Sequence, residues 1–220
     1  MIEQQKQFLT SQFLELAGHV ETAMTNAFNA VLTNDINLAG TVVKNDNTID
    51  TREVVFEEEC LKVLALYQPV AGDLRFIIAL LKINNDMERI ADLAGNMASR
   101  VVALESEERL PIPFNFKGMS ETVQNMLRNV LNSFIHYDPV FVTSIFEDEA
   151  RIDTMHRTMY HNIKEEIMKN PGKINVYINY ISYSRYIERM ADHIVNIAED
   201  IYYLIGGKII RHSDISRNSQ

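Results

Sequence analysis

Apolar residues recur every three to four positions along most of the chain, a spacing that predicts amphipathic α-helices. No stretch alternates apolar and polar residues as a half-buried strand would. The helical pattern covers six stretches: residues 4–34, 36–67, 70–103, 119–136, 139–169 and 173–205. The sequence therefore predicts an all-α protein with helices of roughly 20–33 residues, the length found in helical bundles.

Residues that cap or break helices separate these stretches. Asp35 can cap the second helix, Pro69 ends it, and Asp138-Pro139 precedes the fifth helix with proline expected at its first position. Two prolines and a charge run interrupt the middle of the chain. The predicted organisation is a first three-helix bundle at 1–103, a linker at 104–117, a second three-helix bundle at 118–205 and a polar tail at 206–220.

An internal repeat relates the two halves. Residues 84–96 recur at 184–196 with a constant offset of 100, and both copies share the skeleton Glu-x-x-x-Asp-x-x-x-Asn. The second helices align with an offset of 103, because Ile49 and Asp50 match Ile152 and Asp153. A repeat of this length indicates two copies of one structural unit. The predicted architecture is thus a tandem pair of three-helix bundles.

Carboxylate pairs are the candidate chemistry. An acidic residue stands four positions before an aspartate at four places in the chain, once in the second and once in the third helix of each half. Residues four apart share a helix face, and neighbouring antiparallel helices can bring two such faces together. Carboxylates are preferred ligands of hard metal cations. The predicted metal ligands are Asp46, Asp50, Glu88, Asp92, Glu149, Asp153, Glu188 and Asp192.

Other residues near these pairs are weaker candidates. Asn96 and Asn196 follow the third-helix pairs by one turn, and Glu53 with Glu57 corresponds to His156 with Tyr160 in the second half. For His156, a ligand and an ordinary surface histidine remain equally open. Asn84 and Asn85 are set aside because their counterparts are Ser184 and Arg185, and an arginine would oppose a cation. The remaining histidines, among them His193, are expected to be surface or packing residues.

The net charge of −9 is unevenly distributed. Residues 1–110 hold 17 acidic and 9 basic residues, a net charge of −8, whereas residues 111–220 hold 13 and 12, a net charge of −1. An acidic chain without a basic stripe argues against nucleic acid as the main ligand. Because the first half carries most of the negative charge, we expect it to bind divalent cations more tightly than the second half. A solvated acidic face without metal remains the plainer alternative.

The location of the protein is suggested by three further observations. The first residues do not resemble a signal peptide, since no apolar core follows a basic start. The apolar runs are far too short to span a membrane. Cys60 is the single cysteine, so an internal disulfide is excluded, and we expect it to be a small buried hydrophobic residue. Together these observations favour a cytoplasmic protein.

Four segments resemble the PhoU family of bacterial phosphate-transport regulators: Gln68-Pro-Val-Ala-Gly-Asp-Leu-Arg75, Glu88-Arg-Ile-Ala-Asp92, Glu188-Arg-Met-Ala-Asp-His-Ile-Val-Asn-Ile-Ala-Glu199, and Ile201-Tyr-Tyr-Leu-Ile-Gly-Gly-Lys-Ile-Ile-Arg-His212. The resemblance spans about residues 8–212. It implies multinuclear metal clusters, most often of iron or zinc, at the eight acidic residues. It also implies a non-enzymatic regulator that restrains the ATPase of the phosphate importer and holds the phosphate-sensing histidine kinase inactive when phosphate is plentiful. A homodimer is among the expected assemblies, and membrane contact would come only through partners.

Two other classes compete with this reading. A carboxylate-bridged di-iron oxidase on a helical bundle would need Glu-x-x-His on two helices. This chain offers only Asp153-x-x-His156, once, whereas the first half has Asp50-x-x-Glu53. The other class is a purely structural bundle whose acids bind no metal. An oxygen-dependent absorbance change would favour the oxidase, and an absence of bound metal would favour the structural bundle.

Overall fold

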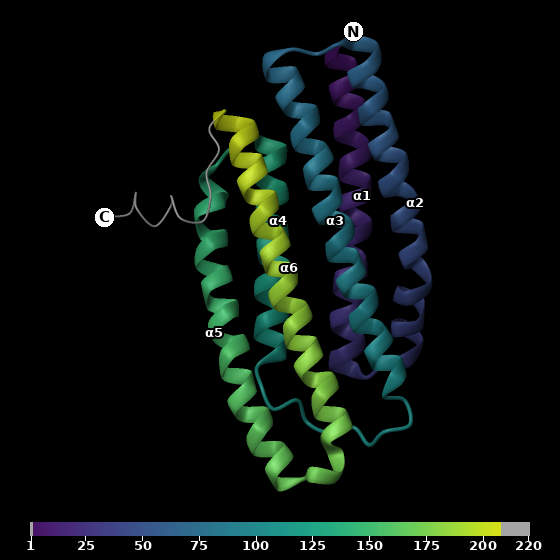
Figure 1. The fold of residues 1–220 in the computed structure, drawn as a ribbon, viewed down its shortest axis with the longest axis vertical. Helices are drawn as coiled ribbons and strands as arrows, with labels where there is room; N and C mark the ends of the chain where they lie inside the picture. Colours follow the sequence, from purple (N-terminus) through teal and green to yellow (C-terminus); the bar gives the residue numbers. More distant parts are fainter. Residues whose placement is uncertain (1, 208–220) are drawn as a thin grey trace, which may run out of the picture.

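The computed structural model describes residues 2–207, apart from the side chains of Phe141 and Thr143, and these residues form helices and no strand. Figure 1 shows two sets of three helices side by side. The elements are α1 (Ile2–Thr33), α2 (Ile36–Tyr67), α3 (Ala71–Ala103), α4 (Phe116–His136), α5 (Val140–Lys169), a 3₁₀ turn (Pro171–Lys173) and α6 (Ile174–Gly206). The all-α prediction and the tandem pair of three-helix bundles are confirmed.

Local sequence explains most helix ends. The Asp35 carboxylate accepts a hydrogen bond of 2.9 Å from the backbone nitrogen of Leu38, as expected of an N-cap. Gly207 follows α6 with a φ of 68°, a left-handed conformation that glycine adopts without steric cost. The polar tail predicted beyond it falls, from residue 208 on, outside the described residues.

Two helix starts differ from the prediction. Helix α4 begins at Phe116 rather than near residue 119, because the side chain of Asn115 accepts a hydrogen bond from the backbone nitrogen of Gly118 and caps it earlier. Helix α5 begins at Val140, so Pro139 is its N-cap and not its first helical residue. The Asp138 carboxylate, just before the N-cap, accepts a hydrogen bond of 2.9 Å from the backbone nitrogen of Val140, the first residue of the helix.

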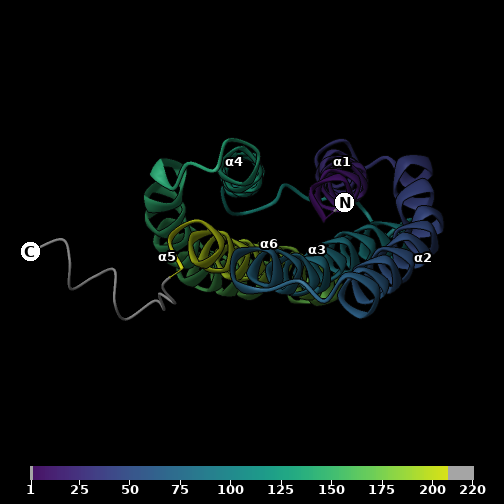
Figure 2. The ribbon, with the colours of Figure 1, turned by 90° about the horizontal axis from the view of Figure 1, so that it is seen from above.

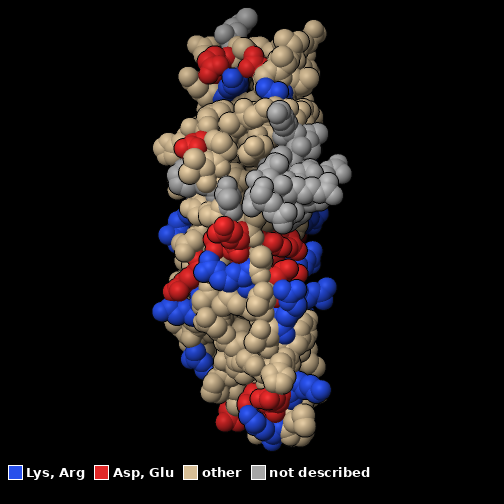
Figure 3. Space-filling view, turned by 90° about the vertical axis from the view of Figure 1, so that its left-hand side faces the viewer, with Lys and Arg blue, Asp and Glu red and all other residues tan. Residues whose placement is uncertain are grey.

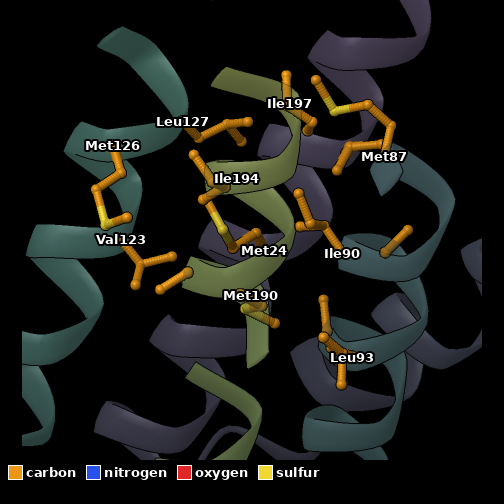
Figure 4. Packing of buried hydrophobic residues seen from close by; sticks show 14 of the residues in the cluster. Met24, Met87, Ile90, Leu93, Val123, Met126, Leu127, Met190, Ile194 and Ile197 are labelled. Atoms are coloured by element: carbon orange, nitrogen blue, oxygen red, sulfur yellow. The ribbon is translucent and has the colours of Figure 1, made fainter. Parts of the chain in front are cut away.

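The two bundles share one continuous core. Seen from above in Figure 2, α3 and α6 lie next to each other at the centre, α1 and α4 cover one side of them, and α2 and α5 lie at the outer ends. Side chains of both bundles meet at the centre, where Met24, Met87 and Ile90 lie near Leu127 and Ile194 (Figure 4). The halves are therefore packed together rather than only joined by a linker.

Polar contacts cross the boundary between α3 and α6. Lys82 forms an ion pair with Asp200, whose carboxylate is largely buried. Asp86 accepts hydrogen bonds from His193 Nδ1 at 2.8 Å and from the amide of Asn196 at 3.3 Å. His193 is thus a specific polar link between the bundles, which goes beyond the surface or packing role expected for it.

Two further predictions concern the single cysteine and the apolar character of the helices. Cys60 is fully buried, as predicted, and its burial raises the pKa of its thiol to about 12, so the thiol is unreactive. None of the helices between residues 2 and 207 combines the length and apolar character needed to cross a bilayer.

Candidate metal centre

Three of the predicted ligands come together between α2 and α3. Asp46, Asp50 and Asp92 each offer a carboxylate oxygen, and these oxygens lie within 4.8 Å of one another. Asp46 and Asp92 are partly buried, and Asp50 is exposed. Three carboxylates at this separation can surround one cation. We call these three residues, together with Glu88 one turn before Asp92, the first centre.

The close approach of Asp46 to α3 depends on a glycine. A Cβ atom built on the buried Gly95 would lie 2.9 Å from Asp46 Oδ2, so a side chain there would displace the carboxylate. In the repeat, Val195 occupies the equivalent position, and the longer Glu149 replaces Asp46. The space beside Gly95 therefore fits the short aspartate of the first half, and it is one reason why the two halves differ.

The first centre carries more negative charge than its neighbouring arginine offsets. Burial, followed by repulsion from Asp50 and Asp92, raises the pKa of Asp46 to about 6. Burial and repulsion from Asp92, Glu53 and Asp50 also raise the pKa of Glu88, although the adjacent Arg89 opposes the shift. A bound cation would relieve this repulsion, which one arginine only partly offsets.

We expect Asp46→Asn to stabilise the metal-free protein near pH 7.5 by about 1 kcal/mol, after allowance for solvent screening of this partly exposed group. The folded-state pKa of Asp46 lies above its ordinary value of 3.8, so the wild type loses stability as the pH rises from about 4 to about 6. Asparagine carries no charge and avoids this loss. Urea unfolding in the presence of a chelator, at pH 4 and at pH 7.5, measures the difference.

The matched control for this prediction is Glu58→Gln, which changes an exposed acid on the same helix. Its effect should stay within about 0.5 kcal/mol at both pH values. If Asp46→Asn stabilised the protein equally at pH 4 and pH 7.5, the repulsion argument would be wrong. At pH 4 the Asp46 carboxyl is still protonated in the folded protein and only partly ionised in the unfolded chain, so most of the loss of stability occurs above that pH.

The equivalent acids of the second bundle lie between α5 and α6. Burial raises the pKa of Glu188, Asp153 and Glu149 add repulsion, and Arg185 and Arg189 oppose it. We call Glu149, Asp153, Glu188 and Asp192 the second centre. Within residues 2–207, no group of three acids or histidines there approaches as closely as Asp46, Asp50 and Asp92.

The surroundings of the two centres differ in charge. Around the first centre, Glu53 and Glu57 add to the four acids, and Arg89 pairs with Glu88 at 3.3 Å and with Asp92 at 3.2 Å. Around the second centre, two arginines accompany four acids. Figure 3, which shows the side of the molecule where α5 lies, displays basic side chains interspersed with acidic ones. The first centre therefore combines six acids with one arginine, whereas the second combines four acids with two arginines.

One residue beside the first centre, Asn84, was set aside from the sequence. Asn84 is 1% exposed, and its amide nitrogen donates hydrogen bonds to Oε1 of Glu53 at 2.7 Å and to the backbone oxygen of Glu53 at 3.1 Å. Its Oδ1 is buried and accepts no hydrogen bond from any described residue. Its place one turn before Glu88 is the signal in the sequence. The arginine at 185 is the counterpart of Asn85 and not of Asn84, so it gave no reason to exclude Asn84.

The two weaker asparagine candidates lie differently. Asn96 is exposed on α3. Asn196 donates its amide hydrogen to Asp86, so it takes part in the contact between the bundles. The other five predicted ligands stay predictions, because their oxygens do not belong to the close group of three: Glu88, Glu149, Asp153, Glu188 and Asp192.

Comparison with known proteins gives consistent matches over nearly the whole chain. A family profile described as "PhoU domain" matches residues 13–101 and 116–201, which correspond to the two bundles. A phosphate-specific transport system accessory protein PhoU homolog of Aquifex aeolicus is 34% identical over 209 residues, covering 95% of each chain. A homolog with the same description from Pseudomonas aeruginosa is 33% identical over 208 residues, covering 94% of this chain and 86% of the relative.

Solved structures match in the same way. The crystal structure of PhoU from Pseudomonas aeruginosa superimposes with a TM-score of 0.91 at 32% identity, covering 94% of this chain and all of that one. The crystal structure of the phosphate transport system regulatory protein PhoU from Streptococcus pneumoniae gives a TM-score of 0.84 at 27% identity, covering 96% of this chain and all of that one.

Proposed function

This chain belongs to the PhoU domain family, and from that premise we propose that it regulates phosphate uptake as an accessory protein of a phosphate transport system. The observation that carries the proposal is the match of both bundles to the family, together with relatives over nearly their full length that are named for this role. The proposed action is to restrain the ATPase of the importer and to keep the phosphate-sensing histidine kinase inactive while phosphate is plentiful.

The regulator acts by binding rather than by catalysis in this proposal, and the acidic first bundle is its interaction surface. Uncompensated negative charge favours a partner with a basic patch and makes the affinity modest and sensitive to salt. A cation at the first centre would reduce this charge and would supply positions at which phosphate or a phosphorylated partner can coordinate. The donor set favours metal there, because Asp46, Asp50 and Asp92 converge and Gly95 leaves room for Asp46.

Complementation tests the proposed role. In a bacterial host that lacks its own PhoU-family protein, expression of this chain should lower phosphate uptake in phosphate-rich medium several-fold and should repress a reporter of phosphate starvation. Uptake of radiolabelled phosphate and the reporter signal are measured together. The Glu58→Gln variant, which changes an exposed acid away from the centres, should complement as the wild type does.

If the chain is expressed, folded and unable to lower either uptake or the reporter signal, the regulatory assignment fails in that host. Co-purification with the chain would show whether it binds the importer ATPase, the kinase or both.

A further inference from the structure

A cavity of about 480 Å³ lies under the linker between α3 and α4. Figure 1 shows this linker crossing the end of the molecule where α1 and α3 end and α6 begins. The cavity is bounded by those helix ends, by the start of α4 and by the linker itself, and no acid of either metal centre lines it. Its volume falls within the range of about 300–1,000 Å³ that is usual for small-molecule sites.

The internal repeat explains why space is left at this end of the molecule. Val176, which lines the cavity, is matched at the offset of 100 by Phe76 in the first bundle. Phe76 is 1% exposed, and its ring stacks on that of Phe134 at 6.5 Å. A valine is too small to fill the volume of that ring, so the smaller side chain contributes to the cavity.

A buried hydroxyl group without a partner lines the cavity. Tyr183 is 2% exposed, and its ring is held between those of Phe116 and Tyr180, at 6.1 Å and 5.8 Å. Its hydroxyl forms no hydrogen bond with any residue between 2 and 207, whereas Tyr180 donates to the backbone oxygen of Leu110 at 2.6 Å. Buried hydroxyl groups are normally hydrogen-bonded, so the Tyr183 hydroxyl is a donor available to a ligand.

The charged groups that act on the two tyrosines of the cavity are both cations. Burial and the neighbouring Tyr180 raise the pKa of Tyr183, and Arg100 opposes the shift. Burial also raises the pKa of Tyr180, and its backbone hydrogen bond and Arg109 oppose that shift. Arg109 donates to the backbone oxygens of the last two residues of α1 and pairs with no acid in the described part of the chain.

The two acids that line the cavity are already held by groups outside it. Glu107 accepts a hydrogen bond from the amide of Asn175 at 2.9 Å, and Glu108 pairs with Lys173 at 2.9 Å. The tyrosine side of the cavity therefore offers a phenolic donor near arginines, and the remaining walls are mainly apolar. An anionic group is the acceptor that such surroundings favour, because its hydrogen bond to a hydroxyl is charge-assisted.

We propose that the cavity under the linker binds a small organic anion. The apolar body of this ligand lies against Val101 and Val176, and its anionic group accepts a hydrogen bond from the hydroxyl of Tyr183. Burial of the apolar body supplies the main driving force, and the hydroxyl and the nearby arginines select for the charge. This inference goes beyond the proposed regulatory role and does not depend on metal binding.

Titration of the full-length chain with the fluorescent anion 8-anilinonaphthalene-1-sulfonate tests the site. Val176→Phe places at this end the residue found at the matching position 76, and it should weaken binding of the dye at least about tenfold by filling the cavity. Tyr183→Phe removes only the hydroxyl and should weaken binding about threefold to tenfold. Tyr202→Phe is the matched control, because Tyr202 lies at the far end of the same helix, and it should leave the affinity unchanged.

A measurement on the wild type avoids any folding defect of the variants. With ¹³C-methyl-labelled valine, sodium octanoate should shift the NMR signals of Val31, Val101 and Val176, which line the cavity. The signals of Val20 and Val63, which are buried elsewhere, should stay in place. Octan-1-ol has the same chain length without the charge, and it should need an at least about threefold higher concentration to cause the same shifts.

Dye binding that is as tight in Val176→Phe as in the wild type, or octanoate that leaves the valine signals of the cavity in place, overturns the inference. Octan-1-ol that acts at the same concentration as octanoate overturns the selection for an anion. Each of these results leaves the proposed regulatory role to the complementation experiment, because no residue of the cavity belongs to either metal centre.

Discussion

Asp50→Ala/Asp92→Ala is expected to lower the metal content of the protein by half or more. Each side chain contributes one of the three oxygens that lie within 4.8 Å of one another, so the variant leaves Asp46 as the single member of that group. Changes in residues that merely orient metal ligands cost about 10–100-fold in affinity, and loss of two ligands should cost at least the upper part of that range. Elemental analysis of protein purified without an affinity tag or a chelator measures the change.

The matched variant is Asp153→Ala/Asp192→Ala, which removes the equivalent acids of the second bundle. We expect it to cause the smaller loss, because two arginines already offset the acids there and the first centre is more acidic. Equal losses from the two variants would disprove this asymmetry. Wild-type protein without iron, zinc or manganese above background would mean that the acids form a solvated or partner-binding surface.

Phe134→Ala should destabilise the protein by about 3–5 kcal/mol, the usual cost of removing a fully buried phenylalanine. Phe134 is 1% exposed on α4, and its ring lies 4.9 Å from that of Phe13 on α1 and 6.5 Å from that of Phe76 on α3. Truncation would open a cavity where the two bundles meet. The free energy of unfolding in urea, measured by circular dichroism, gives the magnitude.

Phe8→Ala provides the comparison, because Phe8 is 43% exposed on α1 and should cost less than about 1 kcal/mol. Wild type and Phe134→Ala are both expected to unfold in one cooperative transition, since a continuous core joins the bundles. Two separate transitions in the wild type, or a Phe134→Ala effect no larger than that of Phe8→Ala, would show that the bundles are energetically independent.

The helices and the repeat follow from the sequence alone because they depend on local rules. The apolar spacing of each stretch, the carboxylate of Asp35 and the glycine at 207 act over a few residues, and the structure places the helices accordingly. The four carboxylate pairs are also visible in the sequence, since residues four apart share a helix face in any α-helix. The family resemblance, which rests on these motifs in order, is confirmed by the matches to both bundles.

The tertiary structure decided which of these acids actually meet. The distance between neighbouring helices depends on the residues packed between them, and the space beside Gly95 lets Asp46 reach Asp92. The partners of Asn84 and His193 depend on the rotation of one long helix against another, and spacing along a single helix carries no information about that rotation. Packing of the whole molecule sets these rotations. The sequence therefore determined the helices and their acidic faces, and only the folded arrangement determined which side chains those faces bring together.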